Sequence, residues 1–197
     1  MARLRRSALV GALLVVLGAC GGPQSTTPDP TSTTSDPTST TGDAAPGERV
    51  YVSLGDSYAT GYRPADAGGP AGDRAGFAYL VAERSQLRLI NLACSGATSA
   101  SLRAEPGCAP GNRGPDAPDS AGRTQLDAAV QALRDHKGRV GLVTVVIGGN
   151  DLTPCAQAQD AVACASQAVA TVRANLAAAL PALRDAAGDA PIVGLTY

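Results

Sequence analysis

Three short polar motifs contain the residue types that could cleave an ester through a serine nucleophile. They are residues 55–57 (GDS), 95–98 (SGAT) and 148–151 (GGND), and each directly follows an apolar stretch. A serine hydroxyl can attack an acyl carbonyl, while backbone N–H groups and an asparagine amide can donate to the oxyanion that forms. Together the motifs predict a nucleophile and its oxyanion donors.

The elements that must position these motifs alternate between strands and helices. β-Branched and apolar runs predict strands at 49–54, 87–92, 140–147 and 191–195. Apolar residues at helical spacing predict helices at 77–84, 124–136 and 161–187, with Thr124 as an N-cap. We expect Pro181 to kink the last helix or to start a new turn. This helix carries one apolar stripe, namely Val162, Val169, Val172, Leu176, Leu180 and Leu183.

This alternation predicts an α/β fold, a parallel sheet with helices on both faces. In such sheets, ligands bind beyond the carboxyl ends of the strands. Ser57, Gly96 and Asn150 each lie just past the end of a predicted strand. All three are therefore expected at the same edge of the sheet.

In order and spacing, the motifs resemble those of the SGNH (GDSL-type) hydrolases, a family of esterases and lipases. The resemblance spans residues 48–197 and rests on 55–61 (GDSYATG), 91–99 (NLACSGATS) and 148–151 (GGND). It implies a flavodoxin-like three-layer α/β/α fold and a site that needs no metal and no cofactor. It also implies that Ser57 is the nucleophile. The oxyanion donors would be the backbone N–H groups of Ser57 and Gly96 and the side-chain amide of Asn150.

Each of these residues has a simpler structural interpretation. Ser57 or Asp56 could cap the helix that follows, and Gly96 could be an ordinary loop glycine. Asn150 could begin a helix, with Asp151 as its cap. The conjunction of three motifs at three strand ends favours catalysis over these separate roles.

The base that would activate the serine is not evident in the sequence. The family places an Asp-x-x-His motif near its C-terminus, and residues 1–197 contain no such motif. The one histidine, His136, is predicted at the amino end of the strand at 140–147, roughly 20 Å from the motifs at about 3.3 Å per residue. We therefore expect His136 to be a helix-terminal residue, and no base His or orienting Asp to lie in this chain. The fold is then expected to be incomplete at the C-terminus.

Four cysteines beyond Cys20 favour disulfides, because an even set in an exported chain commonly pairs. Three connectivities are possible. We favour the local pairs, Cys94–Cys108 and Cys155–Cys164, each of which would close one loop and contribute about 3 kcal/mol. Zinc is disfavoured by the lack of a Cys-x-x-Cys pair.

The N-terminal region predicts export and anchoring. Residues 1–19 combine three arginines with a short apolar run, and 17–20 (LGAC) resembles the lipobox of a bacterial lipoprotein, which implies lipid attachment at Cys20. An ordinary secretory signal is the alternative. Residues 20–47 are rich in Ser, Thr and Pro, which predicts a disordered tether before the domain at 48–197. The expected location is the outer face of a bacterial cell membrane.

These observations lead to three hypotheses. The first is a surface-anchored serine esterase or lipase that forms an acyl-serine intermediate, acts on a lipid ester or an acylated envelope glycan, and is inactive or weak without the His/Asp motif. The second is a non-catalytic module that binds acyl groups or glycans, and the third is an inactive fragment. Low aromatic content, no tryptophan and a mildly acidic balance give no basis for nucleic-acid binding. Loops at 63–76 and 103–122 are expected to shape the pocket.

Overall fold

The computed structural model of the protein describes residues 47–64, 73–120 and 122–197. The predicted signal peptide, Cys20 and all of the predicted tether except Gly47 lie outside the described residues. The same holds for part of the loop at 63–76.

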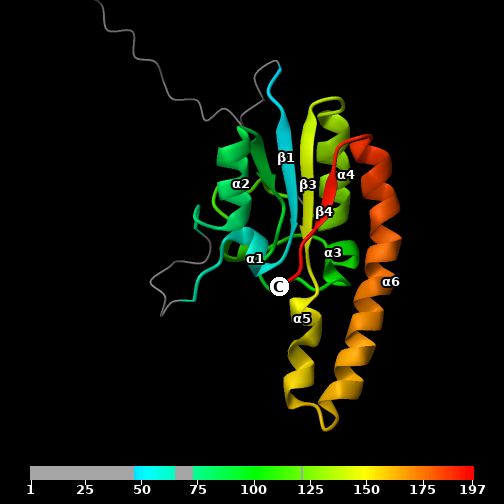
Figure 1. Ribbon diagram of the computed structural model, residues 1–197. Coiled ribbons are helices and arrows are strands. Elements are labelled where there is room, and N and C mark those ends of the chain that lie inside the picture. The colour runs from blue at the N-terminus through cyan, green and yellow to red at the C-terminus, as the bar shows by residue number, and fades with distance from the viewer. Residues whose placement is uncertain (1–46, 65–72, 121) are drawn as a thin grey trace, which may run out of the picture. The chain divides into compact units, whose positions relative to one another are not determined.

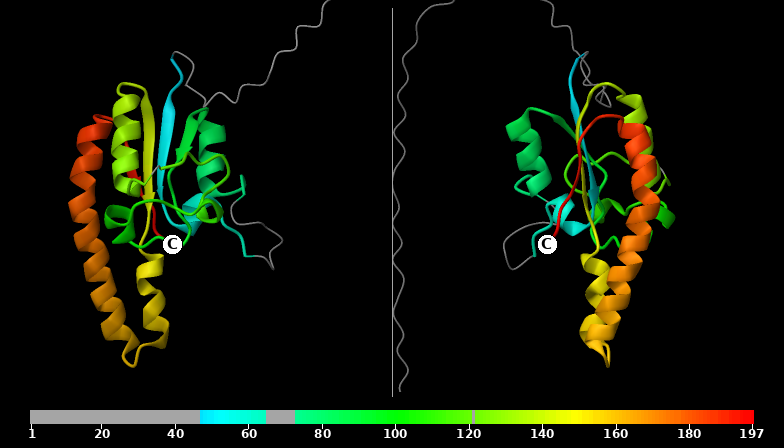
Figure 2. Two further views of the ribbon diagram at one scale, coloured as in Figure 1. Left: turned by 180° about the vertical axis from the view of Figure 1, so that it is seen from behind. Right: turned by 45° about the vertical axis from the view of Figure 1, so that its right-hand side comes forward.

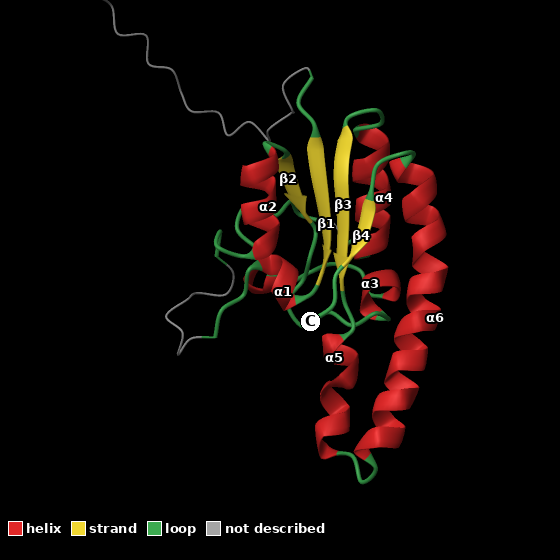
Figure 3. Cartoon of the chain, in the orientation of Figure 1, coloured by secondary structure: helices red, strands yellow, loops and turns green. Residues whose placement is uncertain are grey.

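The described residues form a four-stranded sheet in which every pairing is parallel (Figures 1 and 3). The strands are β1 (Val50–Gly55), β2 (Arg88–Asn91), β3 (Val140–Val146) and β4 (Ile192–Gly194), in the order β2-β1-β3-β4. All four predicted strands are confirmed. β1 is completely buried, as its run of apolar residues requires of a strand covered on both faces.

The three predicted helices are also present. They are α2 (Phe77–Ser85), α4 (Gln125–Asp135) and α6 (Ala161–Ala187). Thr124 caps α4 as predicted, because its hydroxyl accepts the N–H of Asp127. Short helical turns complete the described elements, namely α1 (Ser57–Thr60), α3 (Ser101–Ala104), η2 (Pro110–Asn112), α5 (Gly149–Leu152) and η3 (Thr153–Gln157).

The helices cover the sheet on both sides (Figure 2). α2 packs on one face through a core that includes Tyr51, Ala78 and Ala82. α4 and α6 pack on the other face, where the larger core includes Leu133 of α4 and Leu183 of α6. The predicted three-layer α/β/α arrangement around a parallel sheet is therefore confirmed.

The long helix α6 continues through Pro181, so no separate helical segment starts at this proline. Proline removes the hydrogen bond to the carbonyl of residue 177, but both positions are exposed, so water can satisfy that carbonyl.

The apolar stripe of α6 is not buried along its whole length. Leu183 is 1% exposed, whereas Val162 is 77%, Val169 50% and Leu180 40% exposed. The first half of α6 runs beside α5 beyond the carboxyl end of the sheet, so it has no sheet to pack against (Figure 1).

No helix among the described residues is long and apolar enough to span a bilayer.

Both locally paired disulfides are present. Cys94–Cys108 has a Cα–Cα distance of 5.8 Å and links the loop after β2 to the loop after α3. Cys155–Cys164 has a Cα–Cα distance of 5.5 Å and joins η3 to the start of α6. The second bridge therefore ties together the two helical segments that extend beyond the sheet.

The two halves of α6 should respond differently to truncation of apolar side chains. We expect Leu183→Ala to lower the free energy of unfolding by about 2–5 kcal/mol, because it removes buried contacts and leaves a cavity. Val169→Ala should change that free energy by less than about 0.5 kcal/mol. Urea unfolding followed by circular dichroism measures both. Equal losses for the two variants would contradict the burial described for α6.

Candidate active site

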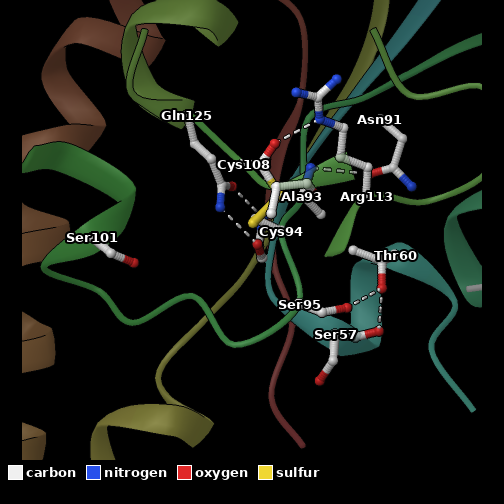
Figure 4. Close-up of a disulfide and its surroundings, with 12 residues drawn as sticks. Ser57, Thr60, Asn91, Ala93, Cys94, Ser95, Ser101, Cys108, Arg113 and Gln125 are labelled. Atoms are coloured by element: carbon white, nitrogen blue, oxygen red, sulfur yellow. Dashed lines mark hydrogen bonds between the residues drawn. A yellow bond between two sulfur atoms is a disulfide. The ribbon is translucent and has the colours of Figure 1, made fainter. Parts of the chain in front are cut away.

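Ser57 is the first residue of α1 and directly follows the carboxyl end of β1. Asp56, which is 2% exposed, caps this helix by accepting the Tyr58 N–H at 3.0 Å. Capping is thus performed by Asp56 and not by Ser57. Among the described residues the Ser57 hydroxyl has no hydrogen-bond partner, and in Figure 4 it points away from Thr60.

The turn that presents Ser57 depends on a close backbone approach at Gly55. A Cβ at this position would lie 2.1 Å from the carbonyl oxygen of Val146, so only glycine fits between β1 and β3. The next residue, Asp56, donates its N–H to the same carbonyl at 3.2 Å. The turn that presents Ser57 is therefore fixed against the end of β3.

The side chain of Gln125 holds both polar groups of the Gly55 backbone. Its Oε1 accepts the Gly55 N–H at 3.1 Å, and its Nε2 donates to the Gly55 carbonyl at 3.0 Å. Gln125 is 7% exposed, so these bonds form away from bulk water. The first turn of α4 therefore fixes the end of the strand that carries Ser57.

The second motif lies beside the first (Figure 4). The Cys94 N–H donates to the Gly55 carbonyl at 3.0 Å, and the Ser95 hydroxyl lies 2.9 Å from that of Thr60 in α1. Gly96 follows with φ of +86°, which glycine adopts readily. Within the described part of the chain its N–H has no acceptor, as an oxyanion donor requires.

The third motif is joined to the second by side-chain hydrogen bonds. Asn150, in α5, donates one amide N–H to the Ala97 carbonyl at 2.8 Å, which orients the amide and leaves its other N–H available. Gly148 precedes α5 with φ of +123°. The three motifs therefore meet at the carboxyl edge of the sheet, where the sequence places them.

Asp151 does not cap α5, contrary to one sequence interpretation. Its carboxylate accepts the Ser99 N–H at 2.9 Å and the Ser99 hydroxyl at 2.6 Å. Asn175 of α6 also donates to the Ser99 hydroxyl, at 2.9 Å. This carboxylate therefore anchors the loop that contains Gly96, whereas α5 begins at Gly149, after the N-cap residue Gly148, with no side-chain cap.

Tyr197 joins the first and third motifs from the far end of the chain. Its hydroxyl donates to Asp56, and its ring packs closely on Gly149, where a Cβ would lie 3.0 Å from the ring. Tyr58 packs edge-on against the Tyr197 ring, at 6.0 Å between centroids, and stacks on Phe77 at 5.6 Å. Burial and the Asp56 hydrogen bond raise the pKa of Tyr197, so the phenol remains a donor at neutral pH.

His136 lies at the opposite edge of the sheet, as predicted. It ends α4, and its Nε2 lies 2.7 Å from a guanidinium nitrogen of Arg88, the first residue of β2. Arginine can only donate, so Nε2 accepts and Nδ1 donates to the Ala132 carbonyl at 2.8 Å. The prediction that His136 is a helix-terminal residue is confirmed, because it forms the C-cap of α4.

The contributions of Gln125, Asp151 and Tyr197 were not predicted. Gln125 sits next to a helix cap, where a polar residue ordinarily faces water. The one sequence signal for a buried role was its position on the first turn of an amphipathic helix.

No group of three or more residues of metal-ligating type is present in the described ranges.

Comparison with known proteins identifies the family to which this chain belongs. The model of the GDSL-like lipase/acylhydrolase family matches residues 53–197, which include all three motifs. Among solved structures, the chain is similar to the crystal structure of protein YXIM from Bacillus subtilis, with 16% identity and a TM-score of 0.46. The match covers 76% of this chain and 33% of that one, so the chain spans about a third of that protein's length. No curated protein matches the chain.

Replacing Gln125 should destabilise the turn that carries Ser57. We expect Gln125→Ala to lower the free energy of unfolding by about 2–3 kcal/mol, because it leaves the buried Gly55 N–H without a partner. Gln131→Ala, on the exposed side of the same helix, should change it by less than about 0.5 kcal/mol. Urea midpoints measure the difference, and equal midpoints would show that the Gln125–Gly55 bonds do not contribute.

Proposed function

The chain belongs to the GDSL-like lipase/acylhydrolase family, and on that basis we propose that it is a serine esterase whose nucleophile is Ser57. The Ser57 hydroxyl attacks the carbonyl carbon of a carboxylic ester, the alcohol leaves, and water hydrolyses the acyl-serine. The backbone N–H groups of Ser57 and Gly96 and the free amide N–H of Asn150 stabilise the oxyanion.

One observation carries this proposal: the three motifs meet at one edge of the sheet with their reactive groups unpaired. The Ser57 hydroxyl and the Gly96 N–H lack partners among the described residues, and Asn150 keeps one amide N–H free. Gly96 is exposed and Ser57 and Asn150 are only partly buried, so these groups can reach a ligand that enters at this edge. Their convergence supports acyl transfer.

The proposed activity of residues 1–197 alone is weak. A serine hydroxyl needs a base, and the imidazole of His136 is held by Arg88 at the other edge of the sheet. Without a base, the oxyanion donors and substrate binding supply only about 10³–10⁴ over the rate in water. An imidazole supplied from outside these residues would raise the rate.

We further propose that the protein works at the outer face of a bacterial cell membrane. The lipobox-like sequence at 17–20 supports lipid attachment at Cys20, and the Ser/Thr/Pro-rich segment supports a tether. The domain would then act on lipid esters or acylated glycans of the envelope, with no nucleic-acid partner.

A second candidate is a binding module that holds acyl groups or glycans without cleaving them. The distance of His136 from the three motifs favours it, because the oxyanion donors can bind a carbonyl oxygen whether or not Ser57 is activated. The two candidates differ in whether Ser57 forms a covalent bond with its ligand.

Substitution of Ser57 tests the esterase proposal. With p-nitrophenyl acetate, we expect the protein to show slow turnover that Ser57→Ala abolishes, and a phosphonate probe to label Ser57. Asn150→Ala should lower the Ser57-dependent rate by about 10²–10³ through loss of one oxyanion donor. Absorbance at 400 nm and intact-protein mass spectrometry provide the two measurements.

The matched control is Ser166→Ala on the exposed part of α6, where the hydroxyl donates only to the carbonyl of Val162. This variant should retain the full rate and the label. If Ser57→Ala also retained both, the nucleophile would have to be another residue. If the native protein bound esters reversibly without any labelling, the binding-module candidate would be favoured.

Cys20 is tested by membrane fractionation of the full chain expressed in a bacterium with a lipoprotein pathway. We expect the native protein in the membrane fraction, released by detergent, and Cys20→Ser in the soluble fraction. The physical reason is that one or more acyl chains at Cys20 supply the membrane affinity. Membrane retention of Cys20→Ser would contradict lipid anchoring at this residue.

A further inference from the structure

We propose that a cavity beside Gly96 binds a small, neutral, hydroxyl-bearing part of the substrate, such as a single sugar residue. This inference rests on the proposed function, because it takes the ester to lie at Ser57. The cavity, hereafter the Gly96 cavity, has a volume of about 350 Å³ and is lined by the second motif and by residues 105–112. Its walls include Cys94, Gly96, Glu105, Cys108, Asn112 and Gln125.

Position favours a role in substrate binding. Gly96 belongs both to the cavity wall and to the proposed oxyanion site. A Cβ built on Gly96 would meet no atom within 4 Å, so the space beside this residue is open. We place the group attached to the ester on this open side, because Gly96 is the residue that the cavity wall and the proposed oxyanion site share.

The walls of the Gly96 cavity are held in place by covalent and hydrogen bonds. The Cys94–Cys108 disulfide joins its two sides, and Gln125 is fixed by its bonds to Gly55 (Figure 4). The Ser101 hydroxyl accepts the Thr98 N–H at 2.8 Å. A cavity with such walls is largely formed before a ligand enters, which lowers the entropic cost of binding.

The lining is unsuited to an acyl chain. Apart from the disulfide, its apolar side chains are the single methyl groups of Ala97 and Ala109, with no aromatic or branched aliphatic residue. Burial of a methylene stabilises by about 0.8 kcal/mol only where apolar walls exclude water. Polar side chains supply most of this lining, so each added methylene would gain little.

Two side chains in the cavity wall can form further hydrogen bonds, and their chemistry favours a ligand with hydroxyl groups. The side chains of Glu105 and Asn112 are exposed and have no partners among the described residues. Among the described residues, no Lys, Arg or His lines the cavity, so an anionic group would face Glu105 uncompensated. An ammonium group would find one carboxylate and no aromatic face. Neutral hydroxyls can donate to Glu105 and exchange hydrogen bonds with Asn112.

The size limits the ligand to about one ring. Pockets for small molecules typically span about 300–1,000 Å³, and the Gly96 cavity lies at the lower end of that range. A monosaccharide ester fits this description, whereas an oligosaccharide would have to extend outside.

Binding to the full-length Ser57→Ala protein tests the inference without turnover. We expect glucose 6-acetate to shift the amide NMR signals of Gly96, Gly107 and Ala109 in a saturable manner. Hexyl acetate and acetylcholine carry an alkyl chain and a cation in place of the sugar. Both can shift Gly96 through the shared acetyl carbonyl, but they should leave the signals of Gly107 and Ala109 unchanged. Tighter or equal binding of either ester at these residues, or no shift with glucose 6-acetate, would overturn the proposal.

Single substitutions in the cavity wall test which side chains contact the bound sugar. Glu105→Ala and Asn112→Ala should each weaken glucose 6-acetate binding by about 10-fold, as expected for loss of one hydrogen bond in the site. Glu83→Ala, on the exposed side of α2, should leave the affinity unchanged. Equal affinities for all three variants would contradict the assignment. Failure of Ser57 labelling would refute the esterase proposal and leave these binding results intact, so the two failures are distinguishable.

Discussion

The site depends on the backbone of Gly55, where three parts of the molecule meet. Its N–H and carbonyl both bond to Gln125 of α4, the carbonyl also accepts the Cys94 N–H, and its Cα packs against the Val146 carbonyl of β3. The approach to Val146 requires a residue without a Cβ, and the bonds from α4 require the side-chain amide of Gln125. The position of Ser57 therefore depends on backbone packing two residues earlier, and not on contacts made by the serine side chain.

Hydrogen bonds from the other two motifs extend this arrangement across the carboxyl edge of the sheet. Asp151 fixes Ser99, Asn150 binds the carbonyl next to Gly96, and Tyr197 reaches Asp56. These bonds leave free the groups that would contact a reacting ester. Most of the bonds that hold these loops are thus made by other residues, while the Ser57 hydroxyl, the Gly96 N–H and the second amide N–H of Asn150 remain available.

The sequence predicted the fold well because its signals were local and periodic. Four apolar strand runs, the Thr124 cap and two short-range cysteine pairs each have a physical cause within a few residues. It failed where the cause was tertiary. The exposed half of α6 has the same apolar spacing as its buried half, and only the length of the sheet decides which half is covered. The pairings of Gln125, Asp151 and His136 depend on partners about 50 or more residues away.

The aromatic residues around Ser57 give the protein a built-in optical signal. The chain has five tyrosines and no tryptophan, so its ultraviolet emission comes from tyrosine alone. Tyr58 directly follows Ser57, and Tyr197 hydrogen-bonds the carboxylate that precedes it. A carboxylate that accepts a phenol proton commonly quenches tyrosine emission. Displacement of the Tyr197 ring from Asp56 would therefore raise the emission, so this contact can be followed without a label.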